Sequence, residues 1–134
     1  MTADTVTLTV PSRGEFAKTV RMTASALVSR MGMTFDEVDD VRIAAEEAFV
    51  YACDHAPESG EVRLDFAVGD GELEIRVRLS AGSRITDEDA ERRAAYATFL
   101  LQSVCDTFEM SSDETGPYLR VVKRAVLESE DAEV

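Results

Sequence analysis

Four polar side chains fall on one face of a predicted helix in the first half of the chain. Tyr51, Asp54 and His55 follow Glu47 by four, seven and eight positions, which is the spacing of neighbours along a helix face. A carboxylate, a phenol and an imidazole side by side could bind a ligand, although most polar helix faces only meet water. A lone histidine near a helix end is more often a cap than a catalyst. The residues alone leave both interpretations open, a binding face and a solvated face.

The helix that carries this face is predicted from Phe35 to His55. Thr34 and Glu37 have the spacing of a capping box, and an acid-rich first turn meets the positive end of the helix dipole. A second face is apolar at three- and four-residue spacing, at Val38, Val41, Ala45, Ala48 and Ala52. This pattern predicts a helix that is buried on one side and polar on the other.

The rest of the chain must position this helix. Alternating residues predict strands at 5–10, 62–68, 73–79, 108–110 and 118–122, and helical spacing predicts two further helices at 15–31 and 86–105. Gly69-Asp70-Gly71 is a hairpin signal between two of the strands. Because the strands follow one another as hairpins, the order βααββαββ predicts an α+β two-layer sandwich. We expect a mixed, mainly antiparallel sheet covered on one face by helices.

Charge and composition exclude some classes of function. The chain has 134 residues and a net charge of −13, which argues against nucleic acid or an anionic membrane as a direct partner. No apolar run reaches membrane-spanning length and no signal-peptide pattern is present, so we expect a soluble, cytoplasmic protein. Cys53 and Cys105 are expected to be free, inert thiols. We expect one domain over 1–126 and an acidic, disordered tail over 127–134.

Three stretches carry a resemblance to a known family. They are FDEVDDVRIAAEEAFVYACDHA at 35–56, TFLLQSVCDTFEM at 98–110 and GPYLRVVKRA at 116–125. In these stretches, and in the order of its elements up to about Lys123, the sequence resembles the bacterial anti-sigma-factor serine-protein kinases of the RsbW and SpoIIAB type. The resemblance implies the fold of histidine-kinase and gyrase ATPase domains.

Family positions on the helix at 35–55 are only partly kept. The family carries a glutamate that helps to activate the attacking hydroxyl, and the matching residue is Glu47. Four residues later the family has an asparagine that helps to hold Mg²⁺, and this chain has Tyr51. A phenol is a poor neutral ligand for a hard cation, and its ring is bulky enough to fill space that a triphosphate needs.

Two further nucleotide motifs also differ from the family. The adenine-binding Asp-x-Gly-x-Gly corresponds to Ser80, Gly82 and Arg84, so that only Gly82 is kept. The Gly-x-Gly that approaches the phosphates corresponds to Ala95 and Ala97, where each β-carbon obstructs close approach of the backbone. Because phosphoryl transfer depends on positioning phosphate and metal, we expect such a site to be very slow. We expect no resident metal or cofactor, with ATP and Mg²⁺ bound only if the pocket still functions.

The helix at 15–31 offers a second candidate surface. Glu15, Lys18, Arg21 and Met22 are three or four residues apart and could line one exposed stripe. Spacing alone favours an ordinary solvated face. The resemblance implies that this region binds a partner protein, with matching contact positions at Glu15 and Lys18, and we include Arg21 of the same stripe as a candidate.

These observations lead to two main hypotheses of different classes. The first is an anti-sigma factor that sequesters a sigma factor, is released by an anti-anti-sigma protein of the STAS type, forms a homodimer and has lost most or all kinase activity. The second is an active ATP-dependent serine-protein kinase in which Glu47 is the base and adenine lies near Ser80 and Gly82. A degenerate pocket that holds another small ligand is a third possibility, and nothing in the residues names that ligand.

Overall fold

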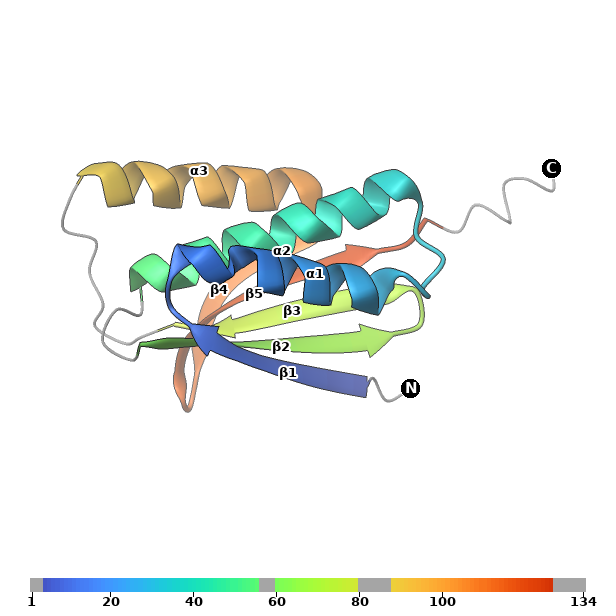
Figure 1. Ribbon diagram of the computed structural model, residues 1–134, viewed down its shortest axis with the longest axis horizontal. Helices are drawn as coiled ribbons and strands as arrows, with labels where there is room; N and C mark the ends of the chain where they lie inside the picture. The colour runs from blue at the N-terminus through green and yellow to red at the C-terminus, as the bar shows by residue number, and fades with distance from the viewer. Residues whose placement is uncertain (1–3, 56–59, 80–87, 127–134) are drawn as a thin grey trace.

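Five strands form one sheet, and three helices lie across one of its faces (Figure 1). The structure is a computed structural model that describes residues 4–55, 60–79 and 88–126. The strands are β1 (Asp4–Pro11), β2 (Glu61–Gly69), β3 (Glu72–Arg78), β4 (Thr107–Asp113) and β5 (Gly116–Arg124). The helices are α1 (Ala17–Val28), α2 (Phe35–His55) and α3 (Glu88–Val104), and the short 3₁₀ helix η1 (Gly14–Phe16) precedes α1. The predicted α+β sandwich and its element order are confirmed.

The sheet is open, with the order β1-β2-β3-β5-β4. Every pairing between described strands is antiparallel, so the sheet contains no parallel pair within this part of the chain. The β2–β3 hairpin has Gly71 in its turn at a φ of 69°, a left-handed conformation that glycine adopts without strain. The strands β4 and β5 are longer than predicted, because their pairing continues from Thr107 opposite Val122 to Asp113 opposite Gly116.

The two faces of the sheet differ in chemistry because strand side chains alternate. Leu64 of β2 and Ile75 of β3 point toward the helices and are almost fully buried. The opposite face carries charged pairs, such as Arg78 with Asp113 at 2.8 Å, and no described helix covers it. The hydrophobic core therefore lies between the helices and one face of the sheet.

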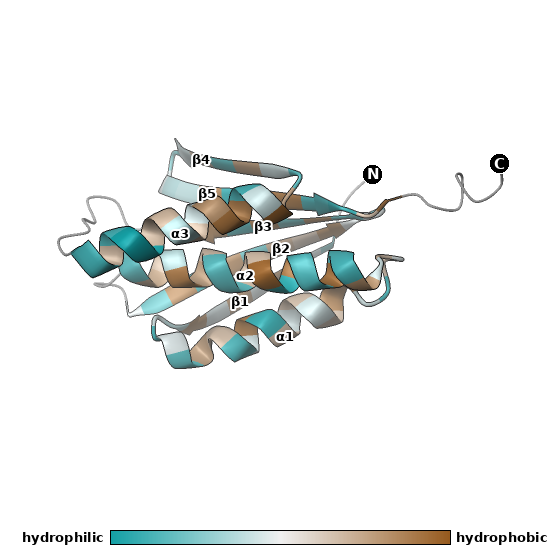
Figure 2. Ribbon diagram, turned by 90° about the horizontal axis from the view of Figure 1, so that it is seen from above, coloured by the Kyte–Doolittle hydropathy of each residue, from teal (hydrophilic) through white to brown (hydrophobic). Residues whose placement is uncertain are grey.

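The helix α2 lies in the middle of the helical layer, with α1 on one side and α3 on the other (Figure 2). It begins at the predicted capping box. The Glu37 amide donates a hydrogen bond to the Thr34 hydroxyl at 3.1 Å, and the Thr34 amide donates one to the Glu37 carboxylate at 2.7 Å. Its inner face is lined with alanines, including the fully buried Ala45 and Ala48, so the helix can approach the sheet closely. The polar residues singled out in the sequence lie on the remaining faces of this central helix.

The helix α1 is shorter than predicted. Residues 14–16 form η1, and α1 itself ends at Val28, although we expected one helix to continue to Met31. A turn follows at 29–32, and Gly32 adopts a φ of 75° there. None of the described helices combines the length and the apolar character needed to cross a membrane.

Candidate functional site

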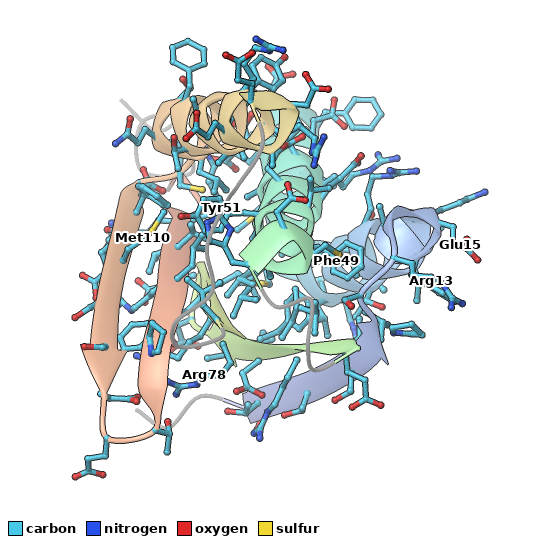
Figure 3. All side chains as sticks on the ribbon, turned by 90° about the vertical axis from the view of Figure 1, so that its left-hand side faces the viewer. Arg13, Glu15, Phe49, Tyr51, Arg78 and Met110 are labelled. Carbon is cyan, nitrogen blue, oxygen red and sulfur yellow. The ribbon has the colours of Figure 1, made fainter. Side chains whose placement is uncertain are left out.

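Tyr51 points from α2 toward the β4 edge of the sheet (Figure 3). Its hydroxyl donates a hydrogen bond to the Met110 sulfur of β4 at 3.4 Å, which joins residues 59 positions apart. Burial raises the pKa of the Tyr51 phenol above its ordinary value, so the phenol stays neutral at physiological pH. The side chain therefore bridges α2 and β4 as an uncharged group.

His55 holds the Tyr51 ring from the other side. The two rings stack with their centroids 4.0 Å apart and their planes within 8° of each other. The His55 Nδ1 donates to the Tyr51 carbonyl oxygen at 2.8 Å, a hydrogen bond within the last turn of α2. His55 thus makes a side-chain hydrogen bond to a carbonyl in the last turns of α2. It also fixes the direction of Tyr51, because the stacked imidazole restricts rotation of the phenol.

Glu47 lies one turn before Tyr51 on α2 and is partly buried. Burial, together with the neighbouring Glu46 carboxylate, raises the pKa of Glu47. A partly buried carboxyl with a raised pKa is a suitable proton acceptor, so this residue keeps one property of a general base.

Ala95 and Ala97 lie in the interior of α3, more than one turn after its first residue. Ala97 is fully buried and Ala95 is exposed. In a helix interior, each backbone N–H donates to the carbonyl four residues earlier, so these two amides are not available to a phosphate.

The free amides of α3 lie in its first turn, which is acidic. Glu88, Asp89 and Glu91 occupy this turn. A helix N-terminus binds anions through its free amides and its dipole, but these carboxylates already interact with that dipole and repel further negative charge. The described part of α3 is therefore unsuited to hold a triphosphate.

Two ion-pair clamps fasten α3 along α2. Near the start of α3, Arg93 donates to both carboxylate oxygens of Asp54 at 3.0 and 3.1 Å. At the other end, the Lys123 ammonium of β5 contacts the Asp40 carboxylate at 2.9 Å and the Val104 carbonyl at 3.0 Å. The two helices run antiparallel between these clamps, in a fixed register.

The adenine-motif positions Ser80 and Gly82, with Arg84, lie outside the described residues. Within the described part of the chain, no group of three His, Cys, Asp or Glu side chains could hold a metal ion. Of the nucleotide-site positions predicted from the sequence, the described ones fall on two helices. Glu47 and Tyr51 are on α2, and Ala95 and Ala97 are on α3.

A shallow groove of about 610 Å³ runs along the exposed side of α1. Its lining residues are Glu15, Lys18, Thr19, Met22, Thr23 and Ala26. The structure thus brings Glu15, Lys18 and Met22 together as one surface, as their spacing predicts. Arg21 instead turns toward α2, where it forms an ion pair with Glu46 at 2.7 Å.

Comparison with known proteins gives the family. The model of the histidine kinase-like ATPase domain matches residues 10–123. The serine-protein kinase RsbW of Halalkalibacterium halodurans is 30% identical over 135 aligned positions, covering 90% of this chain and 83% of the relative. RsbW of Bacillus subtilis is 40% identical over 97 positions, covering 70% of this chain and 61% of that protein. The chain belongs to the RsbW family of serine-protein kinases, within the histidine kinase-like ATPase domains.

A solved structure agrees in fold with this RsbW-family chain. The crystal structure of the RsbU and RsbW domains of Rv1364c from Mycobacterium tuberculosis superposes with a TM-score of 0.64 and 16% identity. The alignment covers 91% of this chain and 32% of that chain. The fold inferred from the sequence is therefore found in a solved protein with RsbW and RsbU domains.

Some contacts of this RsbW-family site could not be found from the sequence. The sequence predicts Met110 only as a strand residue, and nothing in its neighbourhood along the chain indicates that its sulfur accepts a hydrogen bond from the Tyr51 hydroxyl. The Arg93–Asp54 clamp was likewise missed, although opposite charges on two predicted helices were its one visible signal. Thr19, Thr23 and Ala26 join the α1 groove because they share the predicted helical spacing with Glu15 and Met22.

Proposed function

We propose that this chain is an anti-sigma factor that binds a sigma factor directly and is released by a competing anti-anti-sigma protein, with little or no kinase activity of its own. The observation that carries the proposal is the Tyr51–Met110 contact, at the family's metal-ligand position. The family membership supports the sigma-factor and anti-anti-sigma partners. These partners would place the protein in the cytoplasm.

The α1 groove is the surface we assign to the sigma factor. Met22 is 53% exposed at its centre, flanked by the charged side chains of Glu15 and Lys18. An exposed apolar residue with charged neighbours has the composition of a protein–protein contact, in which the apolar centre contributes affinity and the charged rim contributes orientation. Arg21 contributes indirectly, because its ion pair with Glu46 fixes α1 against α2.

Two features argue against nucleotide chemistry at the family position. Tyr51 supplies a phenol where the family has an amide, and its direction is fixed by His55 and Met110. The alanines at 95 and 97 lie within α3, so their backbone amides are engaged in the helix. A site that lacks both the metal ligand and the phosphate loop cannot position a phosphoryl group for transfer.

Calorimetric titration with ATP, with and without Mg²⁺, tests directly whether the protein binds nucleotide. We expect no heat of binding from folded protein at high concentration.

In parallel, Lys18→Glu should weaken binding of the co-purified sigma factor by about tenfold, because it reverses a charge at the rim of the groove. The matched control is Glu47→Ala, which should leave that affinity unchanged. A large loss of sigma-factor binding in Glu47→Ala with an intact fold would refute the assignment of the groove.

An active kinase is the second candidate, and Glu47 is the observation that favours it. The raised pKa of this partly buried carboxyl suits a general base for a serine hydroxyl. Tight, Mg²⁺-dependent ATP binding, followed by phosphate transfer to a partner serine that Glu47→Gln abolishes, would establish the kinase. A Glu46→Gln variant serves as the control, because Glu46 is committed to its ion pair with Arg21.

A homodimer is also part of the proposal, on the strength of the family resemblance. Sedimentation equilibrium over a wide concentration range measures it directly. A single species at the monomer mass at all concentrations would remove the dimer from the proposal and leave sigma-factor binding to be tested by itself.

A further inference from the structure

The outer surface of the helical layer carries exposed apolar side chains on α2 and α3. Tyr96 is 62% exposed and Phe99 is 63% exposed, both on α3, and Ile43 on α2 is 37% exposed. We call these three residues the α2–α3 patch. Seen from above, apolar positions on α2 and α3 lie among hydrophilic ones (Figure 2). Large apolar groups that meet water on neighbouring elements are typical of interaction surfaces.

The register of the two helices places the members of the patch near one another. Arg93 faces α2 at the Asp54 clamp, and Tyr96 and Phe99 follow it at three-residue steps. Each such step turns about 60° around the helix, so these rings lie progressively further outward on the α2 side of α3. Between the two clamps, Phe99 falls opposite the stretch of α2 between Ile43 and Val50.

The surroundings of the patch are strongly acidic. The helices α2 and α3 together contain ten Asp and Glu residues but only three arginines, and the arginines are committed to partners. Arg42 and Arg92 pair within their own helices with Asp39 and Asp89, while Arg93 pairs with Asp54. In contrast, besides the buried Glu37, four carboxylates of these helices form no ion pair with any residue in the described part of the chain, namely Asp36, Glu47, Glu88 and Glu91.

We propose that the α2–α3 patch docks a basic amphipathic helix of a partner protein. Its apolar stripe would cover Ile43, Tyr96 and Phe99, and its lysines and arginines would meet the surrounding carboxylates. The side-chain ridges of a third helix can pack into the grooves between the side-chain rows of α2 and α3. The exposed aromatic rings also attract cationic side chains over their faces, which again favours a basic partner.

This surface is separate from the α1 groove and differs from it in charge. The α1 groove is lined by one acidic and one basic residue, Glu15 and Lys18, so it does not present the negative surface that a basic helix requires. The α2–α3 patch also needs no nucleotide. The inference therefore holds whether or not the sigma factor binds at α1, and the two surfaces can be tested separately.

The test uses a fluorescein-labelled peptide of about 18 residues, long enough to form a helix when bound, with leucines at three- and four-residue spacing and lysines between them. The control peptide has the same composition in scrambled order. In fluorescence anisotropy at about 150 mM salt, where long-range charge effects are screened, the amphipathic peptide should bind the full-length protein about tenfold more tightly than the scrambled one.

Variants of the protein show where the amphipathic peptide binds. Tyr96→Ser/Phe99→Ser should reduce the affinity for the amphipathic peptide by about tenfold. This double variant should remain folded, because both side chains are mostly exposed, and circular dichroism checks the fold. Met22→Ser is the control on α1, since it removes an apolar group that is also more than half exposed, and it should change the affinity by less than about twofold. Asp36→Asn/Glu88→Gln should weaken binding at low salt.

Several results would overturn the proposal. They are equal affinity for the two peptides, no binding of either peptide, or an effect of Met22→Ser as large as that of the α3 double variant. A fourth is a concentration-dependent dimer of the wild type that the α3 double variant abolishes, because the patch would then be covered by a second copy of the chain rather than by a basic helix.

Discussion

Glu37 and Val126 are 89 residues apart, and the Glu37 carboxylate accepts a hydrogen bond from the Val126 amide at 2.7 Å. The other oxygen of the same carboxylate accepts the Thr34 amide, so one buried side chain caps α2 and fastens the segment that follows β5. The start of the central helix and the end of the described chain are therefore joined through one carboxylate. This contact connects two parts of the fold that the sheet does not join.

Glu37→Gln should destabilise the protein by about 1–3 kcal/mol. An amide has one acceptor oxygen where the carboxylate has two, so one of the two backbone N–H groups would face an NH₂ group and lose its partner. Urea denaturation followed by circular dichroism measures the change in the free energy of unfolding. Asp36→Asn is the control, because Asp36 is exposed in the same helical turn and should change stability by about 0.5 kcal/mol or less. Equal effects of the two substitutions would contradict the role of Glu37.

Much of the fold could be predicted from local patterns. The capping box at Thr34 and Glu37, the Gly69-Asp70-Gly71 hairpin and the alternating strands each depend on residues that are close in sequence. The Glu37–Val126 bond and the Tyr51–Met110 bond could not be predicted, because they arise only when distant elements pack together. For the same reason, the spacing that grouped Arg21 with Lys18 could not reveal that Arg21 turns toward Glu46.

Glu47→Gln should stabilise the protein at neutral pH, and the gain should disappear in acid. Burial and the Glu46 carboxylate raise the pKa of Glu47, so the folded state holds this proton more tightly than the unfolded state does. The ionised carboxylate therefore opposes folding at pH 7, whereas below the ordinary pKa of about 4.5 both states are protonated and the penalty is absent.

Thermal unfolding of wild type and Glu47→Gln between pH 3.5 and pH 8 measures this difference. Glu46→Gln is the control, and it should lower stability at pH 7 because it removes the ion pair with Arg21. A Glu47→Gln variant that is less stable than wild type at pH 7 would show that the carboxylate has a stabilising partner.

The two cysteines should react slowly with alkylating reagents. Burial raises the pKa of Cys53 to about 11 and that of Cys105 to about 12. Only the thiolate reacts, so at pH 8 both thiols should be alkylated by iodoacetamide at least about tenfold more slowly in the native protein than in urea. Because the folded state disfavours both thiolates, stability should also decline as pH rises above about 9. Mass spectrometry of peptides from a time course separates the two sites, and a native rate for Cys53 equal to its rate in urea would contradict this prediction.

Restoring the family residues should show which feature prevents nucleotide binding. Tyr51→Asn alone supplies the amide ligand and removes the ring that contacts Met110, but the α3 amides at Ala95 and Ala97 remain engaged within the helix. We therefore expect no ATP binding from this single variant. Tyr51→Asn/Ala95→Gly/Ala97→Gly should gain Mg²⁺-dependent binding in calorimetry, and the two glycines should cost about 1 kcal/mol each in helix stability.

The control variant carries Tyr51→Asn with Ala94→Gly and Thr98→Gly, which weaken the same helix at neighbouring positions. If the single variant or this control binds ATP as well as the triple variant does, the phenol of Tyr51 is the only barrier, and the helical position of the two alanines does not prevent binding.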